Sequence, residues 1–248
     1  MKAALINPMG TTPMVATEMV AFLRNMDERL QDVVFICTDS RDVRIGTYAA
    51  VGAILSRYPR IRTHIKTLDF EDVADEESLL KFLDVLVDTI SEERQFGVNK
   101  LYLNVSGGRK VQNIVASLYA GLLGIDEVYN VFDPDLKNFN AKYEEIKDDV
   151  LDRFEKTDDY LSAYNSIRDR ADHIFFPNLG RLVFLKVGVL QFPESEKMAL
   201  KDAIKGTDIT DGHIEDFKIR AFRDSGFITY DRRRTYSTDL GEIIAKGI

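Results

Sequence analysis

Short apolar runs alternate with amphipathic segments along the first half of the chain, and this order restricts the folds open to it. Continuous apolar runs are typical of parallel strands that are covered on both faces. The strand candidates are 3–8, 33–38, 61–68, 100–106 and 127–133. Apolar residues recur at helical spacing in 13–26, 78–90 and 109–123. The repeated strand–helix–strand order predicts an α/β fold with a doubly wound parallel sheet and right-handed crossovers.

The second half of the chain has a different pattern. From about 137 to 173 it is polar and helical, which favours a solvated connecting helix. A helix is expected to end at Gly206, and a turn with a second helical pair at Gly226. A β-hairpin is expected around Asp231–Arg234, and helices followed by a hairpin predict a winged helix-turn-helix. The expected parts are a Rossmann-like domain over 1–137, a helical connector over 138–175 and a small winged helix-turn-helix domain over 176–248.

Charge and composition narrow the possible functions. The 248 residues carry a formal net charge of −8, which argues against indiscriminate nucleic-acid binding but is compatible with a small anionic ligand. With 45% hydrophobic and 30% charged residues, the chain is expected to be an ordinary soluble globular protein. No apolar run approaches the roughly 18–20 residues that cross a bilayer, and no contact with membranes is predicted. The first residues lack the layout of a signal peptide, so the predicted location is the cytoplasm.

Neither a metal nor a cofactor is predicted. Cys37, the single cysteine, lies in an apolar run and is predicted to be a buried strand residue, which excludes a disulfide framework and a cysteine metal site. The three histidines, His64, His173 and His213, are too scattered to suggest a metal site. The chain has no Walker A loop, G-x-G-x-x-G motif or nucleophile elbow, which disfavours nucleoside triphosphates and dinucleotide cofactors.

Two loops stand out, because ligands of open parallel sheets bind beyond the C-terminal ends of the strands. The first loop, 7–13, contains Gly10, Thr11 and Thr12 before a helix that starts near Pro13. The glycine permits a tight turn, and free backbone N–H groups at a helix start can bind an anion. A plain N-cap, made by one of the threonines, is the alternative interpretation.

The second loop is Ser106, Gly107, Gly108, Arg109 and Lys110, between a strand and a strongly apolar helix. Paired glycines let the backbone approach phosphate oxygens closely. The two cations stand at a helix N-terminus, where positive charge is mildly unfavourable for helix stability. Residues that cost stability there indicate a function, although a glycine-rich turn with solvated basic side chains is the alternative.

With both loops considered, residues 1–150 resemble the CARF family, the ligand-sensing domains of type III CRISPR systems. The segment after 175 resembles the winged-helix domain that many CARF proteins carry. The resemblance implies a homodimer whose paired loops form a two-fold symmetric pocket for a cyclic oligoadenylate, commonly the tetramer. It implies ligand contacts from Gly10, Thr11 and Thr12 in the first loop and from 106–110 in the second.

Among CARF proteins, the chain is most similar to the ring nucleases, which cleave the cyclic messenger without a metal. That resemblance implies attack by a ribose 2′-hydroxyl and a catalytic hydroxyl residue, here Thr11 or Thr12, with Arg109 and Lys110 as the basic groups. These enzymes typically add a lysine from the connector. The corresponding region here offers Arg168 and Arg170 instead, so this lysine is not matched.

Two other branches of the family remain open. A non-enzymatic transcription regulator would bind DNA through the winged helix, but the presumed recognition helix carries acidic residues among its basic ones. DNA is therefore only a weakly supported partner. A HEPN ribonuclease would use an R-x-x-x-x-H motif, and Arg168 and His173 have that spacing. Such spacing is common by chance, and His173 is instead expected to cap a helix or to be partly buried.

Overall fold

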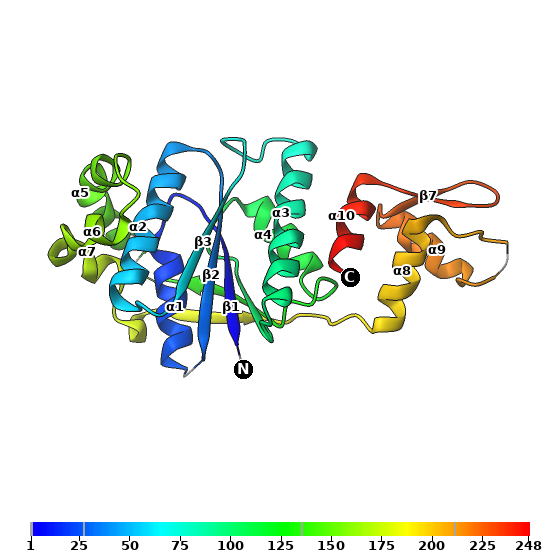
Figure 1. The fold of residues 1–248 in the computed structure, drawn as a ribbon, viewed down its shortest axis with the longest axis horizontal. Coiled ribbons are helices and arrows are strands. Elements are labelled where there is room, and N and C mark those ends of the chain that lie inside the picture. Colours follow the sequence, from blue (N-terminus) through cyan, green and yellow to red (C-terminus); the bar gives the residue numbers. More distant parts are fainter. Residues whose placement is uncertain (1, 27, 135, 211) are drawn as a thin grey trace.

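A six-stranded sheet forms the centre of the molecule (Figure 1). The computed structural model describes residues 2–26, 28–134, 136–210 and 212–248, with the backbone alone at 136–140. The strand order is β3-β2-β1-β4-β5-β6, and only the pair of β5 and β6 is antiparallel. The strands are β1 Ala3–Pro8, β2 Leu30–Cys37, β3 Arg62–Thr67, β4 Lys100–Asn104, β5 Glu127–Phe132 and β6 Val183–Val187. The predicted mainly parallel α/β sheet is confirmed.

Successive side chains of each strand point to opposite sides of the sheet, so both faces carry apolar side chains and helices cover each face. Ala3 and Leu5 of β1 join one buried cluster, and Ala4 and Ile6 join the other. Helices α1, α2 and α5–α7 lie on the first face and α3 and α4 on the second (Figure 1). The bounds of these helices are α1 Met14–Asn25, α2 Arg41–Arg57, α3 Glu76–Gln95, α4 Lys110–Tyr119, α5 Leu136–Phe154, α6 Tyr160–Asn165 and α7 Arg168–Phe175.

The predicted connector is helical, but it is not solvated throughout. Helices α5, α6 and α7 pack against α1 and α2, and they bury large side chains such as Phe154, Tyr164 and Phe175. A Cβ atom on Gly52 of α2 would lie 2.3 Å from the carbonyl oxygen of Tyr160, so the helices approach at backbone distance. The described polar residues of this segment lie on the outer face of these helices. Burial of their inner face makes them part of the domain core.

The sheet extends beyond the predicted end of the first domain at 137. Strand β6 falls inside the predicted C-terminal segment 176–248, yet it pairs with β5. Its side chains are mostly exposed, as in the other edge strand, β3, although four of its five residues are apolar. The edge of the sheet is thus completed by a strand that follows α5, α6 and α7 in sequence.

The C-terminal unit contains two helices, a hairpin and a last helix. They are α8 Glu194–Gly206, α9 Asp216–Asp224, β7 Ile228–Tyr230, β8 Thr235–Ser237 and α10 Asp239–Gly247. The predicted helix end at Gly206 and the hairpin are confirmed. The expected second helical pair is the single helix α9 in the described part of this region, and α10 was not predicted. Helix α10 packs against α3, where Lys246 pairs with Asp84.

No described helix combines the length and the low charge that crossing a bilayer requires.

Glu18 of α1 makes the stability of the fold dependent on pH. Its side chain is 3% exposed, and burial, followed by the nearby charge of Asp133, raises its pKa to about 7. In the unfolded chain the Glu18 carboxyl ionises near its ordinary pKa of 4.5, so between pH 4.5 and 7 the folded state holds a proton that the unfolded state has lost. Stability should therefore fall as the pH rises from about 4.5 to 7, by about 3 kcal/mol.

We expect Glu18→Gln to abolish this loss, because a neutral amide carries no ionisation cost. The free energy of unfolding, measured with urea at pH 5 and pH 8, should differ less in the variant than in the wild type. Glu144→Gln, at an exposed position of α5, is the matched control and should keep the wild-type difference. If the pH dependence of Glu18→Gln equalled that of the wild type, ionisation of Glu18 would not be the cause of the lost stability.

Candidate functional site

The two predicted loops touch each other at the C-terminal edge of the sheet. They follow β1 and β4, which are neighbours at the point where the strand order reverses. A Cβ atom on Gly107 would lie 2.4 Å from the carbonyl oxygen of Pro8, and one on Gly10 would lie 3.0 Å from the nitrogen of Gly108. Gly108 has a φ of +71°, which other residues rarely adopt. Glycines at these positions are therefore needed for the loops to meet.

A buried amide network fixes this junction. Asn104 Nδ2 donates to Asn7 Oδ1 at 3.0 Å and to the carbonyl of Val15 at 3.1 Å. Asn104 Oδ1 accepts from the backbone N–H and the hydroxyl of Ser106, while Ser106 Oγ accepts from the N–H of Val131. Ser106, predicted to contact the ligand, thus has its hydroxyl engaged within the fold. Its arrangement suits the positioning of the loop.

The threonines of the first loop are not engaged in this way. Helix α1 has Pro13 at its N-cap position without a side-chain cap, so neither threonine acts as the plain N-cap considered above. Thr11 is exposed and Thr12 is half-buried. Within the described residues, neither hydroxyl has a hydrogen-bond partner. Both remain available to a ligand.

A small cavity of about 130 Å³ opens where the loops meet. The loops after β1, β2, β3 and β4 all contribute to its wall. The lining residues are Met9, Gly10, Thr11, Thr38, Ser40, Val43, Glu71, Asp72, Gly108, Arg109 and Gln112. The structure thus brings Gly10, Thr11, Gly108 and Arg109 of the predicted set to one cavity.

Arg109 is held at the cavity by an acidic residue that the sequence did not single out. Its Nε and Nη2 atoms each donate to a carboxylate oxygen of Asp72 at 2.6 Å. The Arg109 guanidinium lowers the pKa of the Asp72 carboxyl. Lys110, exposed in the first turn of α4, pairs with no carboxylate in the described part of the chain. The cation of Arg109 is thus compensated in a single chain, whereas that of Lys110 is not.

Gln112 is a second residue that the sequence reasoning missed. It is 1% exposed, and its Oε1 accepts from the N–H of Arg109 at 2.8 Å. Its Nε2 has no partner among the described residues, although it is buried at the cavity wall. A glutamine three positions after a helix N-cap is a known capping signal and could have been recognised.

The basic residues of the connector lie away from this cavity. Arg168 of α7 is 4.0 Å from Asp172, which also pairs with Arg57 at the C-terminal end of α2. The cavity lies at the other end of α2, beside Ser40. Arg170 pairs with Asp149 of α5. The structure therefore does not bring Arg168 or Arg170 to the loops.

His173, which shares α7 with Arg168, is exposed, whereas a capping or partly buried side chain was expected. A different histidine belongs to a group that could hold a metal. Ligand atoms of Asp32, His64 and Glu93 lie within 4.8 Å of one another in the described structure. Both Asp32 oxygens already accept hydrogen bonds from Arg62 at 2.6 Å, so an internal cation neutralises this carboxylate. We assign no metal to this group.

Comparison with known protein families identifies the family of this chain. Residues 12–184 match the family model described as CRISPR-associated protein NE0113. The chain belongs to this family. The predicted resemblance to CARF proteins of type III CRISPR systems is thereby confirmed.

The chain is also similar to a curated protein and to a solved structure. The chain is 26% identical over 170 residues to a protein of Saccharolobus solfataricus named CRISPR system ring nuclease SSO2081, covering 66% of this chain and 92% of the relative. It is also similar to Enterococcus italicus Csm6 bound to cyclic hexa-2′-fluoro-hexa-dAMP, with a TM-score of 0.45 and 19% identity. That match covers 82% of this chain but spans less than half, 46%, of the Csm6 chain.

Proposed function

We propose that this NE0113-family protein binds a cyclic oligoadenylate at the joined loops and cleaves it as a ring nuclease. The contact between Gly107 and Pro8 carries the proposal, because it joins two glycine turns into one site at the strand ends. Helix α4 begins there with Lys110, next to Arg109. The relative named a ring nuclease supports cleavage as the reaction. Cyclic tetra-adenylate is the proposed ligand.

The proposed reaction needs positioned groups and stabilisation of negative charge. A ribose 2′-oxygen attacks the adjacent phosphorus in line and forms a 2′,3′-cyclic phosphate. The bond from phosphorus to the 5′-oxygen breaks, and the proton lost from the 2′-hydroxyl is balanced by one gained at the 5′-oxygen. Two such cleavages convert the ring into two linear di-adenylates. Lys110 and Arg109 would stabilise the charge on the phosphate oxygens, and Thr11 would orient the reacting phosphate.

A second copy of the chain is the proposed partner. Helix α4, which begins at the second loop, exposes three apolar side chains. The exposed fractions are 36% for Val111, 56% for Ile114 and 67% for Leu118. An apolar helix face of this kind is typical of an interface. Two copies that pair along α4 would bring both sets of loops together around a two-fold axis. The symmetry would then match that of a ring with repeating phosphates.

The regulator alternative depends on DNA binding by the C-terminal unit, for which the winged-helix assignment stays a proposal. Lys218 of α9 pairs with Glu196 at 2.9 Å and with Glu215 at 3.0 Å, and Arg223 pairs with Asp224 at 2.6 Å. These carboxylates compensate the charge that a DNA reader would direct to phosphates. The ring-nuclease proposal is therefore favoured.

Incubation of the purified protein with cyclic tetra-adenylate in EDTA should yield linear di-adenylate with a 2′,3′-cyclic phosphate, identified by mass spectrometry. Thr11→Ala should slow this reaction at least about tenfold, because a cavity-lining hydroxyl is lost. Thr12→Ala is the matched control and should change the rate little, since Thr12 does not line the cavity. Tight binding without product would favour the regulator. Absence of binding would refute the assignment of the loops.

A further inference from the structure

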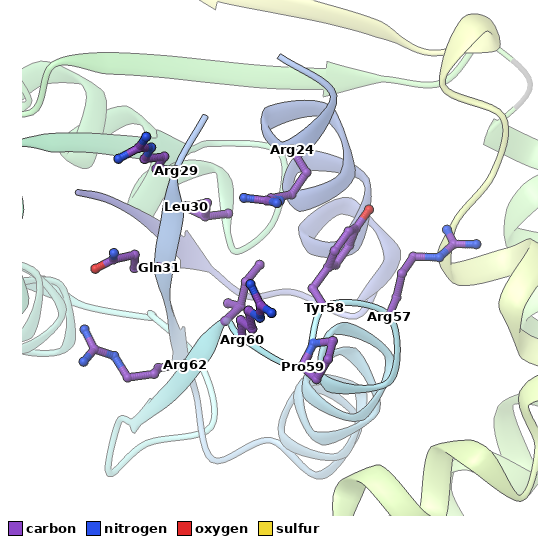
Figure 2. Close-up of a pocket in the computed structure, with 10 residues that line it drawn as sticks. Arg24, Arg29, Leu30, Gln31, Arg57, Tyr58, Pro59, Arg60 and Arg62 are labelled. Atoms are coloured by element: carbon purple, nitrogen blue, oxygen red, sulfur yellow. The ribbon is translucent and has the colours of Figure 1, made fainter. Parts of the chain in front are cut away.

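A second concave site lies at the edge of the sheet opposite to the loops. It is formed where α1 and α2 end and where β2 and β3 begin, and its volume is about 590 Å³. This volume lies in the range of small-molecule sites. Figure 2 shows Arg29 and Arg62 on one side of the site and Tyr58 and Arg57 on the other, with Arg24 between them. We call this site the arginine pocket.

The arginine pocket is strongly cationic although the protein is acidic. Five arginines line it, namely Arg24, Arg29, Arg57, Arg60 and Arg62, and none of the described lining residues is acidic. The whole chain carries a formal net charge of −8. Like charges gathered in one concave site repel each other, and the concave shape concentrates their field on whatever enters. An anionic ligand would relieve this repulsion.

Two of the five side chains are fixed by acidic neighbours outside the lining. Arg62 donates twice to Asp32 at 2.6 Å, and Asp32 is 1% exposed. Arg57 pairs with Asp172 at 3.2 Å, and its guanidinium lies 4.1 Å from the centre of the Phe176 ring. Figure 2 shows these two side chains at opposite sides of the pocket.

The other three side chains have no carboxylate partner in the part of the chain that the structure describes. Arg24 donates only to the backbone carbonyl of Glu28, at 3.1 Å. Arg29 and Arg60 are exposed, and their side chains make no hydrogen bond or ion pair with described residues. Three guanidinium groups that lack a carboxylate partner among the described residues suit a ligand with more than one negative charge. Their planar donor arrays match the oxygens of phosphate groups in pairs.

We propose that the arginine pocket binds a small ligand with two or more linked phosphate groups. Tyr58, which is half-buried, and Pro59 add an apolar part to the wall that a nucleoside can cover. Nucleoside polyphosphates and inorganic polyphosphate share the required chemistry. The proposal does not rest on the proposed cleavage of cyclic oligoadenylate, because the pocket contains no residue of the two loops.

The test is calorimetric titration of the full chain with inorganic tripolyphosphate and, separately, with ATP in EDTA at 0.15 M salt. Both are expected to bind, and tighter binding of ATP would identify a nucleoside contribution. Arg29→Ala combined with Arg60→Ala should weaken binding about 100-fold, since two charged donors are lost. Weakening by Arg109→Ala but not by this double variant would place the phosphates at the two loops and would overturn the proposal.

Arg232→Ala combined with Arg233→Ala is the matched control, since it removes two exposed arginines of the β7–β8 turn. Equal weakening in this control would overturn the proposal, because binding would then depend on overall charge. Failure of both probes to bind would overturn it as well. Binding of single-stranded RNA but of neither probe would assign the pocket to a macromolecule and would also refute the small ligand. Unchanged melting temperatures of the variants would verify that they fold.

Discussion

Lys110→Ala should lower the rate of cyclic oligoadenylate cleavage about 100-fold or more, the loss that follows removal of one donor to a developing oxyanion. Lys110 is exposed at the start of α4 and has no acidic partner among the described residues, so its charge is available to phosphate oxygens. Single-turnover kinetics with saturating enzyme would measure the effect on the chemical step. A rate within about threefold of the wild type would exclude Lys110 from catalysis.

Variants of the neighbouring ion pair serve as controls for this result. Arg109→Ala should weaken binding about tenfold or more, because a charge-assisted contact is lost. Asp72→Asn keeps the size of the side chain but removes the carboxylate that accepts from Arg109. It should tighten ligand binding, since the guanidinium would no longer be shared with an internal anion. Equal weakening by Arg109→Ala and Asp72→Asn would show that the pair serves only to hold the loops together.

Gly107→Ala should abolish most of the activity without unfolding the protein. The added Cβ would lie 2.4 Å from the carbonyl oxygen of Pro8, so the two loops would have to separate. Displacement of reacting groups by about 1 Å can reduce a rate about 100-fold. Overpacking of this kind should also lower the free energy of unfolding by about 1–3 kcal/mol. Initial cleavage rates and urea unfolding would measure the two effects.

Gly188→Ala is the matched control for this substitution. A Cβ atom at Gly188 would meet no heavy atom within 4 Å, and the residue has no left-handed backbone conformation. Activity and stability should therefore stay at the wild-type level. If Gly107→Ala behaved like Gly188→Ala, the contact between the loops would not determine the geometry of the site.

The sequence predicted those elements whose pattern is local. Strands β1, β2, β4 and β5 were recognisable because most of their side chains are buried, which produces apolar runs, whereas the edge strand β3 was predicted although none of its side chains is fully buried. Strand β6 contains the apolar run Val183–Leu185, so its strand character had a local signal, but its pairing with β5 across three intervening helices had none. Helix α2 was missed because small residues such as Gly46, Ala49 and Gly52 are buried around it, so it presents no single apolar stripe. Its surroundings come from α5–α7, which follow much later in the sequence.

The sites, too, could be predicted only where their residues are adjacent in the sequence. The loops were predicted from glycines and cations that are adjacent in sequence, whereas the partnership of Asp72 with Arg109 arises only when the loops after β3 and β4 meet. The arginine pocket likewise combines residues from four elements or their ends. Only the run Arg57–Arg62 gives a local signal, and an exposed turn would give the same pattern.

The position of β6 has a consequence for the order in which the chain can fold as it is synthesised. Strands β1–β5 and their helices are complete before α5, α6 and α7 emerge, but β5 then lacks a neighbour on its outer side. An uncovered strand edge is a template for association with other nascent chains. Until residue 187 has left the ribosome, the outer side of β5 stays unpaired, and β6 then becomes the antiparallel edge strand of the sheet.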